Sequence, residues 1–423
     1  MKTVAKSFIA AILGWQVRRL RKKNNFQIVA VAGSIGKTST KLAVANVLKA
    51  GKRVQYQDGN YNDLVSVPLI FFGQVMPSLY NPLAWLTVFW RNETQLHKAY
   101  PYDVVVVELG ADGPGQMRKF SAYLKPDIGV LTSIVPEHMV FFKDIDSVAQ
   151  EELVIAKLST LTLVNKDLVP DTYRSQITGT TLAYATKQNA DFQIINAVFN
   201  DDKCDFELTR AGQKFLQASQ ELVSEPQLYS VTAAIAVAAE LGLDAETIKK
   251  GLANIHPVSG RMQRLNGVND SLIIDDTYNA SPDATKAALD TLYRIKAAHK
   301  IAVLGNMNEL GEYSEASHKE IGAYCDPKQL ELVLTIGPDA NKYLAPAAEA
   351  KGCKVTTFDS PYTAGDYLKP IIKEGTVILA KGSQNKVFAE ETVKIILADP
   401  KGASKLVRQN ADWLKIKAKA FKA

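Results

Sequence analysis

The feature that most constrains the fold of this 423-residue chain is an apolar segment that leads into a glycine turn and then into a helical pattern. It runs Ile28-Val-Ala-Val-Ala-Gly-Ser-Ile-Gly-Lys-Thr-Ser-Thr40. A strand, turn and helix of this kind present backbone N–H groups to phosphate oxygens, while Lys37 reaches the terminal phosphates and the Thr38 hydroxyl can bind Mg²⁺. The full eight-residue pattern would place glycine at Val31, so this is the shorter Gly-x-x-Gly-Lys-Thr form. We therefore expect a nucleoside triphosphate at a loop made of Gly33, Ser34, Gly36, Lys37, Thr38 and Ser39.

Apolar runs that alternate with helical patterns predict the fold class. Four short runs bounded by turn residues lie in the first part of the chain: Gln27 to Val31, Val104 to Leu109, Ile128 to Ile134 and Leu161 to Val164. This alternation is typical of an α/β protein with a mostly parallel, doubly wound sheet. Residues 191–223 suggest antiparallel strands, and an alanine-rich helix from Leu228 to Leu241 follows them.

A second α/β pattern begins after Gly260 and predicts a smaller, Rossmann-like domain. Its strands are expected at Ser271 to Ile274, Lys300 to Leu304, Leu332 to Ile336 and Thr376 to Ala380. The expected organisation is an N-terminal helix over 1–25, a central phosphate-binding domain over 26–256, a C-terminal domain over 257–398 and a basic tail over 399–423.

Positive charge is concentrated at the two ends of the chain. The net charge is +6, and residues 1–25 carry seven basic and no acidic side chains, while residues 401–423 carry seven basic and one acidic. A surplus confined to the ends points to a local anionic partner and excludes a nucleic-acid channel through the body. The three cysteines lie far apart without a Cys-x-x-Cys pair, which suits a reducing cytosol and argues against a zinc ribbon.

Two apolar segments fall outside the regular alternation. The run from Phe8 to Trp15 precedes a dense cluster of arginine and lysine, is too short to span a bilayer, and has its charges on the wrong side for a secretory signal. It predicts either an interfacial helix or a helix packed on the first domain. The second segment, residues 71–101, holds Trp85 and Trp90 and predicts either a buried helix or a surface for a membrane or a partner.

Two polar side chains follow predicted strands of the first domain. Glu108 ends one strand, and His138 lies just after another. Because the carboxyl ends of parallel strands meet at one edge of a sheet, both side chains are expected beside the phosphate loop, where they can meet Mg²⁺ and phosphate. The alternatives are a helix-capping role for Glu108 and an ordinary loop residue at His138.

Several motifs resemble those of one enzyme family. They are Asp275-Asp-Thr-Tyr-Asn279, the segment from Leu304 to Gly311 with Ser314 and His318, Lys381-Gly-Ser383, Gly59-Asn-Tyr-Asn62 and Gly260-Arg261. From about residue 26 to about residue 395 the chain is similar to the ATP-dependent Mur ligases of peptidoglycan synthesis, and within them to the MurF type. The resemblance implies ATP and Mg²⁺ as cofactors and a cytoplasmic enzyme. The basic ends suggest, in addition, peripheral contact with the inner face of the plasma membrane.

The resemblance also implies a mechanism and a role for each motif. An acceptor carboxylate attacks the γ-phosphate of ATP, and an amino group then displaces phosphate from the acyl phosphate to form an amide. The implied catalytic set is Lys37, Glu108, His138 and Glu152, and the implied metal site is Thr38, Glu108, His138 and Glu152. Implied nucleotide contacts in the second domain are Arg261, Asp275, Asp276 and Asn279. Implied substrate contacts are Asn60, Asn62, Asn306, Glu309, His318, Lys381 and Ser383.

Glu152 marks a departure from the family pattern. Most Mur ligases carry at this position a lysine that CO₂ carbamylates, so that its terminal carboxylate bridges metal ions. Alignment of the run from Phe142 to Glu152 with the family places that position at Glu152, directly after Glu151. We expect an encoded carboxylate to replace the carbamate. The alternatives are a solvated helix face for both glutamates and a shifted alignment that makes Lys157 the candidate.

The acceptor substrate is the open part of this interpretation. A standard MurF-type enzyme has an N-terminal domain that binds the uridine nucleotide of its substrate, and only about 25 residues precede the phosphate-binding strand here. We expect a muramyl-peptide acceptor joined to D-alanyl-D-alanine or a similar amino substrate. A lipid-linked precursor and a polyglutamate-type acceptor are the alternatives, and a non-catalytic ATP-binding partner of the cell-wall machinery is the remaining interpretation.

Overall fold

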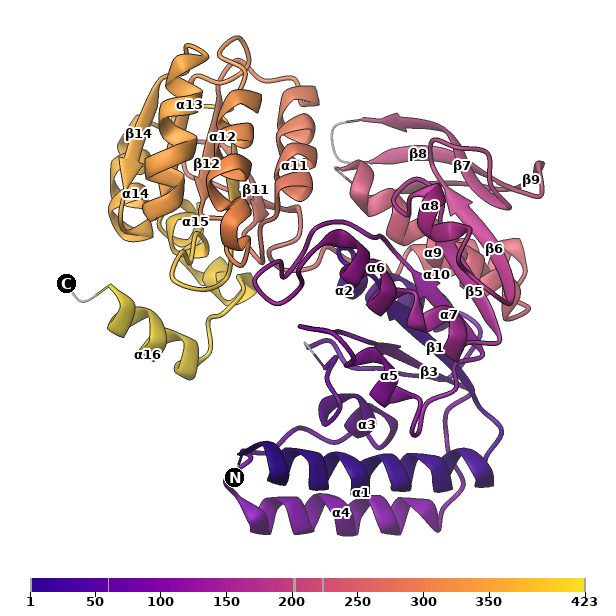
Figure 1. The fold of residues 1–423 in the computed structure, drawn as a ribbon. Coiled ribbons are helices and arrows are strands. Elements are labelled where there is room, and N and C mark those ends of the chain that lie inside the picture. The colour runs from indigo at the N-terminus through magenta and orange to yellow at the C-terminus, as the bar shows by residue number, and fades with distance from the viewer. Residues whose placement is uncertain (1, 60, 201–202, 223, 422–423) are drawn as a thin grey trace. The chain divides into compact units, whose positions relative to one another are not determined.

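The computed structural model describes residues 2–59, 61–200, 203–222 and 224–421. The chain forms two compact units. Unit 1 comprises Met1–Leu222 with Pro226–His256, and unit 2 comprises Val223–Glu225 with Pro257–Ala423. Each unit contains a sheet with helices packed on it, as Figure 1 shows.

Within the described residues, unit 1 is built on a nine-stranded sheet in the order β2-β3-β1-β4-β5-β6-β7-β8-β9. The strands are β1 (Gln27–Ala32), β2 (Val54–Gln55), β3 (Val104–Glu108), β4 (Ile128–Leu131), β5 (Leu161–Asn165), β6 (Thr180–Ala185), β7 (Phe192–Phe199), β8 (Cys204–Arg210) and β9 (Gln213–Gln220). Pairing is parallel from β2 through β7 and antiparallel from β7 through β9. The predicted mostly parallel sheet is confirmed.

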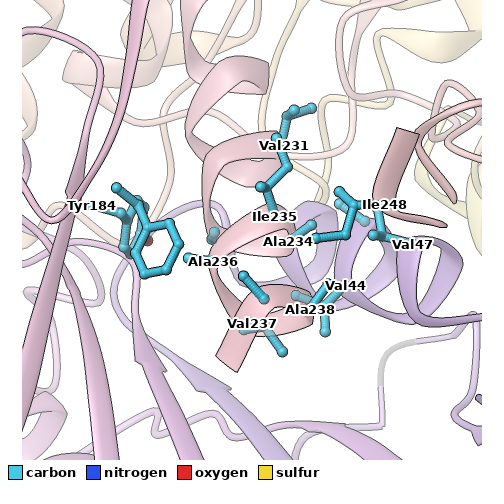
Figure 2. Packing of buried hydrophobic residues seen from close by; sticks show 14 of the residues in the cluster. Val44, Val47, Tyr184, Val231, Ala234, Ile235, Ala236, Val237, Ala238 and Ile248 are labelled. Carbon is cyan, nitrogen blue, oxygen red and sulfur yellow. The ribbon is translucent and has the colours of Figure 1, made fainter. Parts of the chain in front are cut away.

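Helices cover both faces of this sheet because its central strands are apolar on both sides, as is usual for parallel strands. One face packs on α2 (Lys37–Leu48), α9 (Glu225–Glu240) and α10 (Ala245–Leu252). The other packs on α1 (Lys2–Lys23), α3 (Ser66–Phe71), α5 (Met117–Phe120), α6 (Ile145–Glu152) and α7 (Val154–Leu158). Figure 2 shows Ile235 of α9 among Val44 and Val47 of α2 and Ile248 of α10. The alanines of α9 favour the helix and let it approach its neighbours closely.

The register of the central strands brings three loops to one edge of the sheet. In β1, Val31 pairs with Glu108 of β3, and Ala32 pairs with Leu131 of β4. The carboxyl ends of β3, β1 and β4 are therefore level. The phosphate loop follows β1 directly, so it lies between Glu108 and the residues that follow β4.

The N-terminal segment is a packed helix with an exposed side. Leu13, Val17 and Leu20 of α1 are fully buried, so the interpretation as a helix packed on the first domain holds for this side. Phe8 and Trp15 nevertheless remain 66% and 47% exposed.

The apolar segment 71–101 likewise has a buried side and an exposed side. Its main helix is α4 (Pro82–Leu96), in which Trp85 and Val88 are buried, whereas Leu86 and Trp90 are 62% and 67% exposed. One tryptophan thus fits the buried-helix interpretation and the other lies at the surface. No helix of the described residues is both long and apolar enough to cross a membrane.

Unit 2 carries, in its described part, a six-stranded sheet in the order β10-β11-β15-β12-β13-β14. The strands are β10 (Gln263–Asn266), β11 (Leu272–Asp276), β12 (Lys300–Gly305), β13 (Leu332–Ile336), β14 (Val355–Phe358) and β15 (Val377–Lys381). Only β10 among them pairs antiparallel. The helices are α11 (Pro282–Arg294), α12 (Ser314–Tyr324), α13 (Ala345–Ala350), α14 (Pro361–Leu368), α15 (Glu390–Ile396) and α16 (Ala411–Ala420). The predicted second, smaller α/β fold is confirmed.

The basic C-terminal segment packs into unit 2. Lys417 of α16 is fully buried, where its ammonium lies 2.8 Å from Glu390 and 2.6 Å from Glu391. Arg408 makes a bidentate pair with Glu390 at 2.8 and 2.7 Å. Two of the positive charges in this segment are therefore neutralised within the unit.

Candidate active site

The phosphate loop has a backbone that only glycine adopts easily at two positions. Gly33 has φ +128° and Gly36 has φ +84°. A Cβ at Gly33 would lie 2.2 Å from the Thr132 hydroxyl oxygen, so any side chain there would collide with the loop after β4. Gly36 is also the N-cap of α2, and no side chain caps that helix. The first N–H groups of α2, which include those of Thr38 and Ser39, therefore form an N-terminus suited to an anion.

Residues after β4 hold the loop in this shape. The Ser34 N–H donates to the Ser133 carbonyl at 3.0 Å, and the Ile35 N–H donates to the Ser133 hydroxyl at 2.9 Å. In return, the Ser34 hydroxyl accepts the Val135 N–H at 3.1 Å. The loop is thus preorganised by the protein itself.

Lys37 folds back over its own loop. Its ammonium donates to the carbonyls of Gly33 at 2.6 Å and Ser34 at 2.7 Å and lies 3.4 Å from the Glu137 carboxylate. Burial lowers the pKa of Lys37, but the carboxylates of Glu137, Glu152 and Glu108 outweigh it and leave the pKa above its ordinary value. The lysine stays charged in a site with several acids, and phosphate oxygens can replace its loop carbonyls.

The adjacent glutamates at the end of α6 are both buried, so their interpretation as a solvated helix face is wrong. Glu152 accepts the Gly33 N–H at 2.7 Å and therefore touches the phosphate loop directly. Burial, and secondarily the charge of Glu137, raises the pKa of Glu152 to about 7 despite the nearby Lys37. Glu151 faces elsewhere and accepts the N–H groups of Gly115 and Met117. Lys157 of α7, the candidate of a shifted alignment, is exposed.

Glu108 lies at the loop edge with one carboxylate oxygen available. It is 2% exposed, and Asn62 donates to its Oε1 at 3.4 Å. Its Oε2 has no hydrogen-bond partner, although the Lys41 ammonium lies 3.5 Å away. Lys41 is fully buried and also donates to the Gly59 carbonyl at 2.9 Å. Glu108 is thus a buried carboxylate with unused acceptor capacity, as a cation ligand would be.

His138 lies farther out on the same side. It has φ +54°, and its Nε2 is 3.8 Å from Glu137 and 4.0 Å from Asp112. In the part of the chain that the structure describes, no three His, Cys, Asp or Glu side chains come together as a metal cluster. The structure therefore does not assemble Glu108, His138 and Glu152 into one ligand set by themselves.

Two residues of this site are absent from the sequence-based expectations. Glu137 pairs with Lys37, and its only signal was its place next to His138 in a loop expected at the site. Lys41 lies one helical turn after Lys37, on the same side of α2, and this spacing could have pointed to it. The site thus contains two lysines among three buried or partly buried carboxylates, so neutralising a polyphosphate there would also need a bound cation.

Unit 2 has its own lysine–carboxylate centre at the carboxyl ends of β11 and β15. The Lys381 ammonium lies 2.5 Å from Asp276 and donates to the Asn279 carbonyl at 3.0 Å. The other oxygen of Asp276 accepts the Met262 N–H at 3.1 Å. Strand register makes this pair, because Asp276 and Lys381 stand directly opposite each other in the sheet.

The neighbouring acid and the arginine of the same motifs are also placed. Asp275 is fully buried, with one oxygen bound by the N–H and hydroxyl of Thr277 and the other without a partner. Burial raises the pKa of Asp275 to about 6. The Arg261 guanidinium lies 4.1 Å from the centre of the Tyr278 ring. The loop from Asp275 to Asn279 therefore carries a stacked cation beside its acids.

The C-terminal segment fixes this loop. Arg408 donates to the carbonyls of Thr277 at 2.6 Å and Tyr278 at 3.0 Å while its other hydrogen bonds go to Glu390. No motif marked Arg408 in the sequence, because it lies some 130 residues beyond the loop that it holds.

Most of the expected substrate residues in unit 2 are internal to the fold. The Ser383 hydroxyl accepts the Asn308 N–H at 2.9 Å, and buried Asn306 accepts the Ala340 N–H at 2.8 Å. His318 is fully buried, with its Nε2 accepting the Met307 N–H at 3.0 Å. These side chains shape loops at the carboxyl edge of the sheet. Glu309 differs in being partly exposed, with φ +64°. Asn60 lies outside the described residues.

Comparisons with known proteins relate this chain to the Mur ligases. The family model "Mur ligase middle domain" matches residues 90–238, and the model "Mur ligase, glutamate ligase domain" matches residues 260–384. The chain is 28% identical over 389 residues to the UDP-N-acetylmuramoyl-tripeptide–D-alanyl-D-alanine ligase of Bacillus subtilis, covering 88% of this chain and 76% of that protein. It is 27% identical to the enzyme of the same name from Haemophilus influenzae, covering 88% and 77%. The crystal structure of MurF ligase from Thermotoga maritima in complex with ADP superposes with a TM-score of 0.75 at 24% identity, covering 94% and 84%.

Proposed function

Because the chain belongs to the Mur ligase family, we propose that it is an ATP-dependent amide ligase of peptidoglycan precursor synthesis, most like the MurF type. A substrate carboxylate attacks the γ-phosphate of ATP, and an amino group then displaces phosphate from the acyl phosphate. Such a reaction chiefly requires positioning and charge neutralisation. The observation that carries the proposal is the phosphate loop with Lys37 held among Glu108, Glu137 and Glu152 at one edge of the unit 1 sheet.

The residues of unit 1 fit magnesium-bound ATP. Lys37 and the first N–H groups of α2 would bind the phosphates. The Thr38 hydroxyl and Oε2 of Glu108, which has no hydrogen-bond partner, would hold Mg²⁺. The ion would supply positive charge to the phosphate oxygens when bound. The Lys41 ammonium, 3.5 Å from Glu108, would help to hold this carboxylate in place.

Glu152 supports a ligase that needs no carbamylated lysine. Its carboxyl group is encoded, buried and bonded to the first glycine of the phosphate loop. It would hold the loop and, when ionised, add negative charge behind it. Activity should therefore persist in bicarbonate-free buffer, and strong dependence on added bicarbonate would contradict this role.

The loop of unit 2 from Asp275 to Asn279, which we call the motif loop, is proposed to contribute to nucleotide binding. Arg261 and Asn279 are partly exposed and can offer a guanidinium and an amide to a nucleotide. Asp276 and Lys381 bond each other, so we assign them the task of holding Asn279. Four buried side chains would contribute by fixing the shapes of their loops: Asp275, Asn306, His318 and Ser383.

The proposed substrates are a muramyl-peptide carboxylate and D-alanyl-D-alanine or a similar amino compound. The relatives carry the names of such ligases, and the chain spans about three quarters of their length. A lipid-linked precursor is the second candidate acceptor, and the exposed aromatic side chains of α1 and α4 favour it. We place the enzyme in the cytoplasm with peripheral contact to the plasma membrane.

A substrate panel tests the proposal. Soluble uridine-linked and lipid-linked muramyl tripeptides, and a polyglutamate acceptor, would each be paired with D-alanyl-D-alanine or single amino acids. Phosphate release and product mass are measured together. An amide product with stoichiometric ADP supports the ligase. ATP binding without turnover on any pair would instead favour a non-catalytic partner protein.

A further inference from the structure

Helices α1 and α4 lie side by side and run in the same direction at the margin of unit 1 (Figure 1). Gln16 donates to the Phe89 carbonyl at 3.1 Å, and Lys23, farther along α1, donates to the Leu96 carbonyl farther along α4. Between them, Asn92 donates to the Gln16 side chain at 2.9 Å in a fully buried position. The two helices therefore form one rigid layer.

This layer leaves a row of apolar side chains in solvent, and all but one of them are large. On α1, Phe8, Ala11 and Trp15 are exposed at helical spacing, and on α4 Leu83, Leu86 and Trp90 are exposed at helical spacing. Leu83 is 73% exposed and Trp90 is 67% exposed. We call these six side chains the helix-pair face.

One ion pair shows that the two rows adjoin. The Arg19 guanidinium lies 4.4 Å from the centre of the Trp15 ring and 2.6 Å from Glu93 of α4. Glu93 stands one helical turn beyond Trp90, so the two share a side of α4. Trp15 and Trp90 thus flank the same seam between the helices.

The charge around the helix-pair face has one sign. On α1, Arg18 and Lys22 continue the exposed row that begins with Phe8, and Arg91 follows Trp90 on α4. Glu93 is the only acid in the sequences of the two helices, and it is paired with Arg19. The face is thus apolar and aromatic with a cationic border.

We propose that the helix-pair face docks on the surface of a bilayer that contains anionic lipid. Tryptophan and phenylalanine enter the boundary between headgroups and acyl chains, and the bordering cations meet lipid phosphates. The pair would lie in the interface plane, with its apolar face toward the acyl chains. A two-fold dimer through this face would set its cations against themselves, which disfavours a second copy of the chain as the occupant.

Docking would bring the enzyme to lipid-linked substrates. That consequence rests on the proposed function, but the docking itself does not. Vesicle binding measured without ATP or substrate therefore separates the two. If binding fails while the substrate panel gives amide product, the docking inference falls and the ligase stands.

Co-sedimentation of the full chain with vesicles is the test. Vesicles of phosphatidylcholine alone are compared with vesicles that also contain phosphatidylglycerol. The apolar variant is Phe8→Ser, Trp15→Ser and Trp90→Ser, and all three side chains are exposed, so the fold should persist. Its matched control is Val198→Ser, Tyr313→Ser and Ile371→Ser, three exposed apolar side chains outside the helix-pair face. The charge variant is Lys22→Gln and Arg91→Gln, with Lys328→Gln and Lys351→Gln as its control.

We expect the native chain to bind the anionic vesicles and to be released by salt. The apolar variant should lose at least about tenfold in partitioning, and the charge variant about fivefold for each cation. Both controls should bind like the native chain, and every variant should keep its phosphate release with soluble substrates. Equal binding by the apolar variant and the native chain overturns the proposal. So does a native dimer, seen by light scattering, that the apolar variant dissociates.

Discussion

Each unit places a lysine beside a carboxylate at the carboxyl edge of its sheet, but the two lysines are bound differently. Lys37 lies 3.4 Å from Glu137 and otherwise bonds carbonyls of its own loop. Lys381 lies 2.5 Å from Asp276, which a backbone N–H also binds. The side chain of Lys381 is 3% exposed, and that of Lys37 is 15% exposed.

This difference in how the two lysines are bound indicates which of the two lysine–carboxylate centres can bind a ligand. In unit 1, no side chain caps the N-terminus of α2, and the phosphate loop leaves the first N–H groups of that helix for an anion. In unit 2, Arg408 and Lys381 satisfy the carbonyls of the motif loop. Substitutions in unit 1 should therefore cost activity, whereas substitutions in unit 2 should cost stability first.

The largest effect on stability is expected at Lys381. Lys381→Met leaves Asp276 without its cation in a nearly buried position, which should lower the free energy of unfolding by about 3–5 kcal/mol. Chemical denaturation measures this loss. Adding Asp276→Asn should restore part of it. A variant that is inactive but fully stable would show that Lys381 is held for a substrate, and the contrast between the units would fail.

Lys37→Met should chiefly reduce activity, whereas Lys381→Met should chiefly reduce stability. It removes the cation that meets the terminal phosphates, so phosphate release should fall by about 100- to 1000-fold, as for other preorganised charge stabilisers. The free energy of unfolding should fall by less than in Lys381→Met, because Lys37 lies 3.4 Å from its carboxylate partner and is more exposed than Lys381. Lys351→Met, at an exposed position, serves as the control. A large loss of stability in Lys37→Met would contradict the distinction.

Glu152 should make the free energy of unfolding depend on pH. Its folded-state pKa of about 7 lies above the ordinary 4.5, so its protonated form stabilises the fold below about pH 4.5 and that contribution is lost as pH rises through 7. Glu152→Gln should therefore reduce the fall in unfolding free energy between about pH 4 and 8 by up to roughly 3 kcal/mol. Parallel pH profiles with Glu151→Gln as the comparison would show whether the effect is specific. Identical native and Glu152→Gln profiles would refute it.

Arg408 should give the smallest of these effects. Arg408→Gln removes hydrogen bonds to Thr277 and Tyr278, although Lys417 still pairs with Glu390, so we expect a loss of about 2 kcal/mol. If the loop also presents Arg261 to a nucleotide, KM for ATP should rise more than kcat falls. Lys401→Gln, at an exposed position, is the control. Unchanged stability and unchanged KM would show that Arg408 does not hold the motif loop.

The sequence predicts the framework of the fold well because its signals are local. The apolar β-branched run of β1 and the glycines at 33 and 36 determine a strand and a turn without help from distant residues. Trp85 and Trp90 show the limit. Both belong to one helix, and only packing against α1 decides which of them is buried.

The site is predictable where strand ends carry it and unpredictable where contacts cross the chain. Glu108 is expected from its place at the end of β3, and the structure puts it beside the loop. Two other contacts depend on tertiary folding. They are the ion pair of Glu137 with Lys37 and the hydrogen bond from Arg408 to the Tyr278 carbonyl. His318 looks like a substrate residue in its motif, yet its buried hydrogen bond to Met307 gives it a structural task.

The most direct test of the account follows the oxygen atoms of the acceptor. The active substrate pair would be incubated with ATP after the acceptor carboxylate has been labelled with ¹⁸O, and the phosphate and amide products would be weighed by mass spectrometry. With both carboxylate oxygens labelled, attack of that carboxylate on the γ-phosphate predicts one labelled oxygen in each phosphate released and the other in the amide carbonyl. Unlabelled phosphate, or release of AMP and pyrophosphate, would contradict the account.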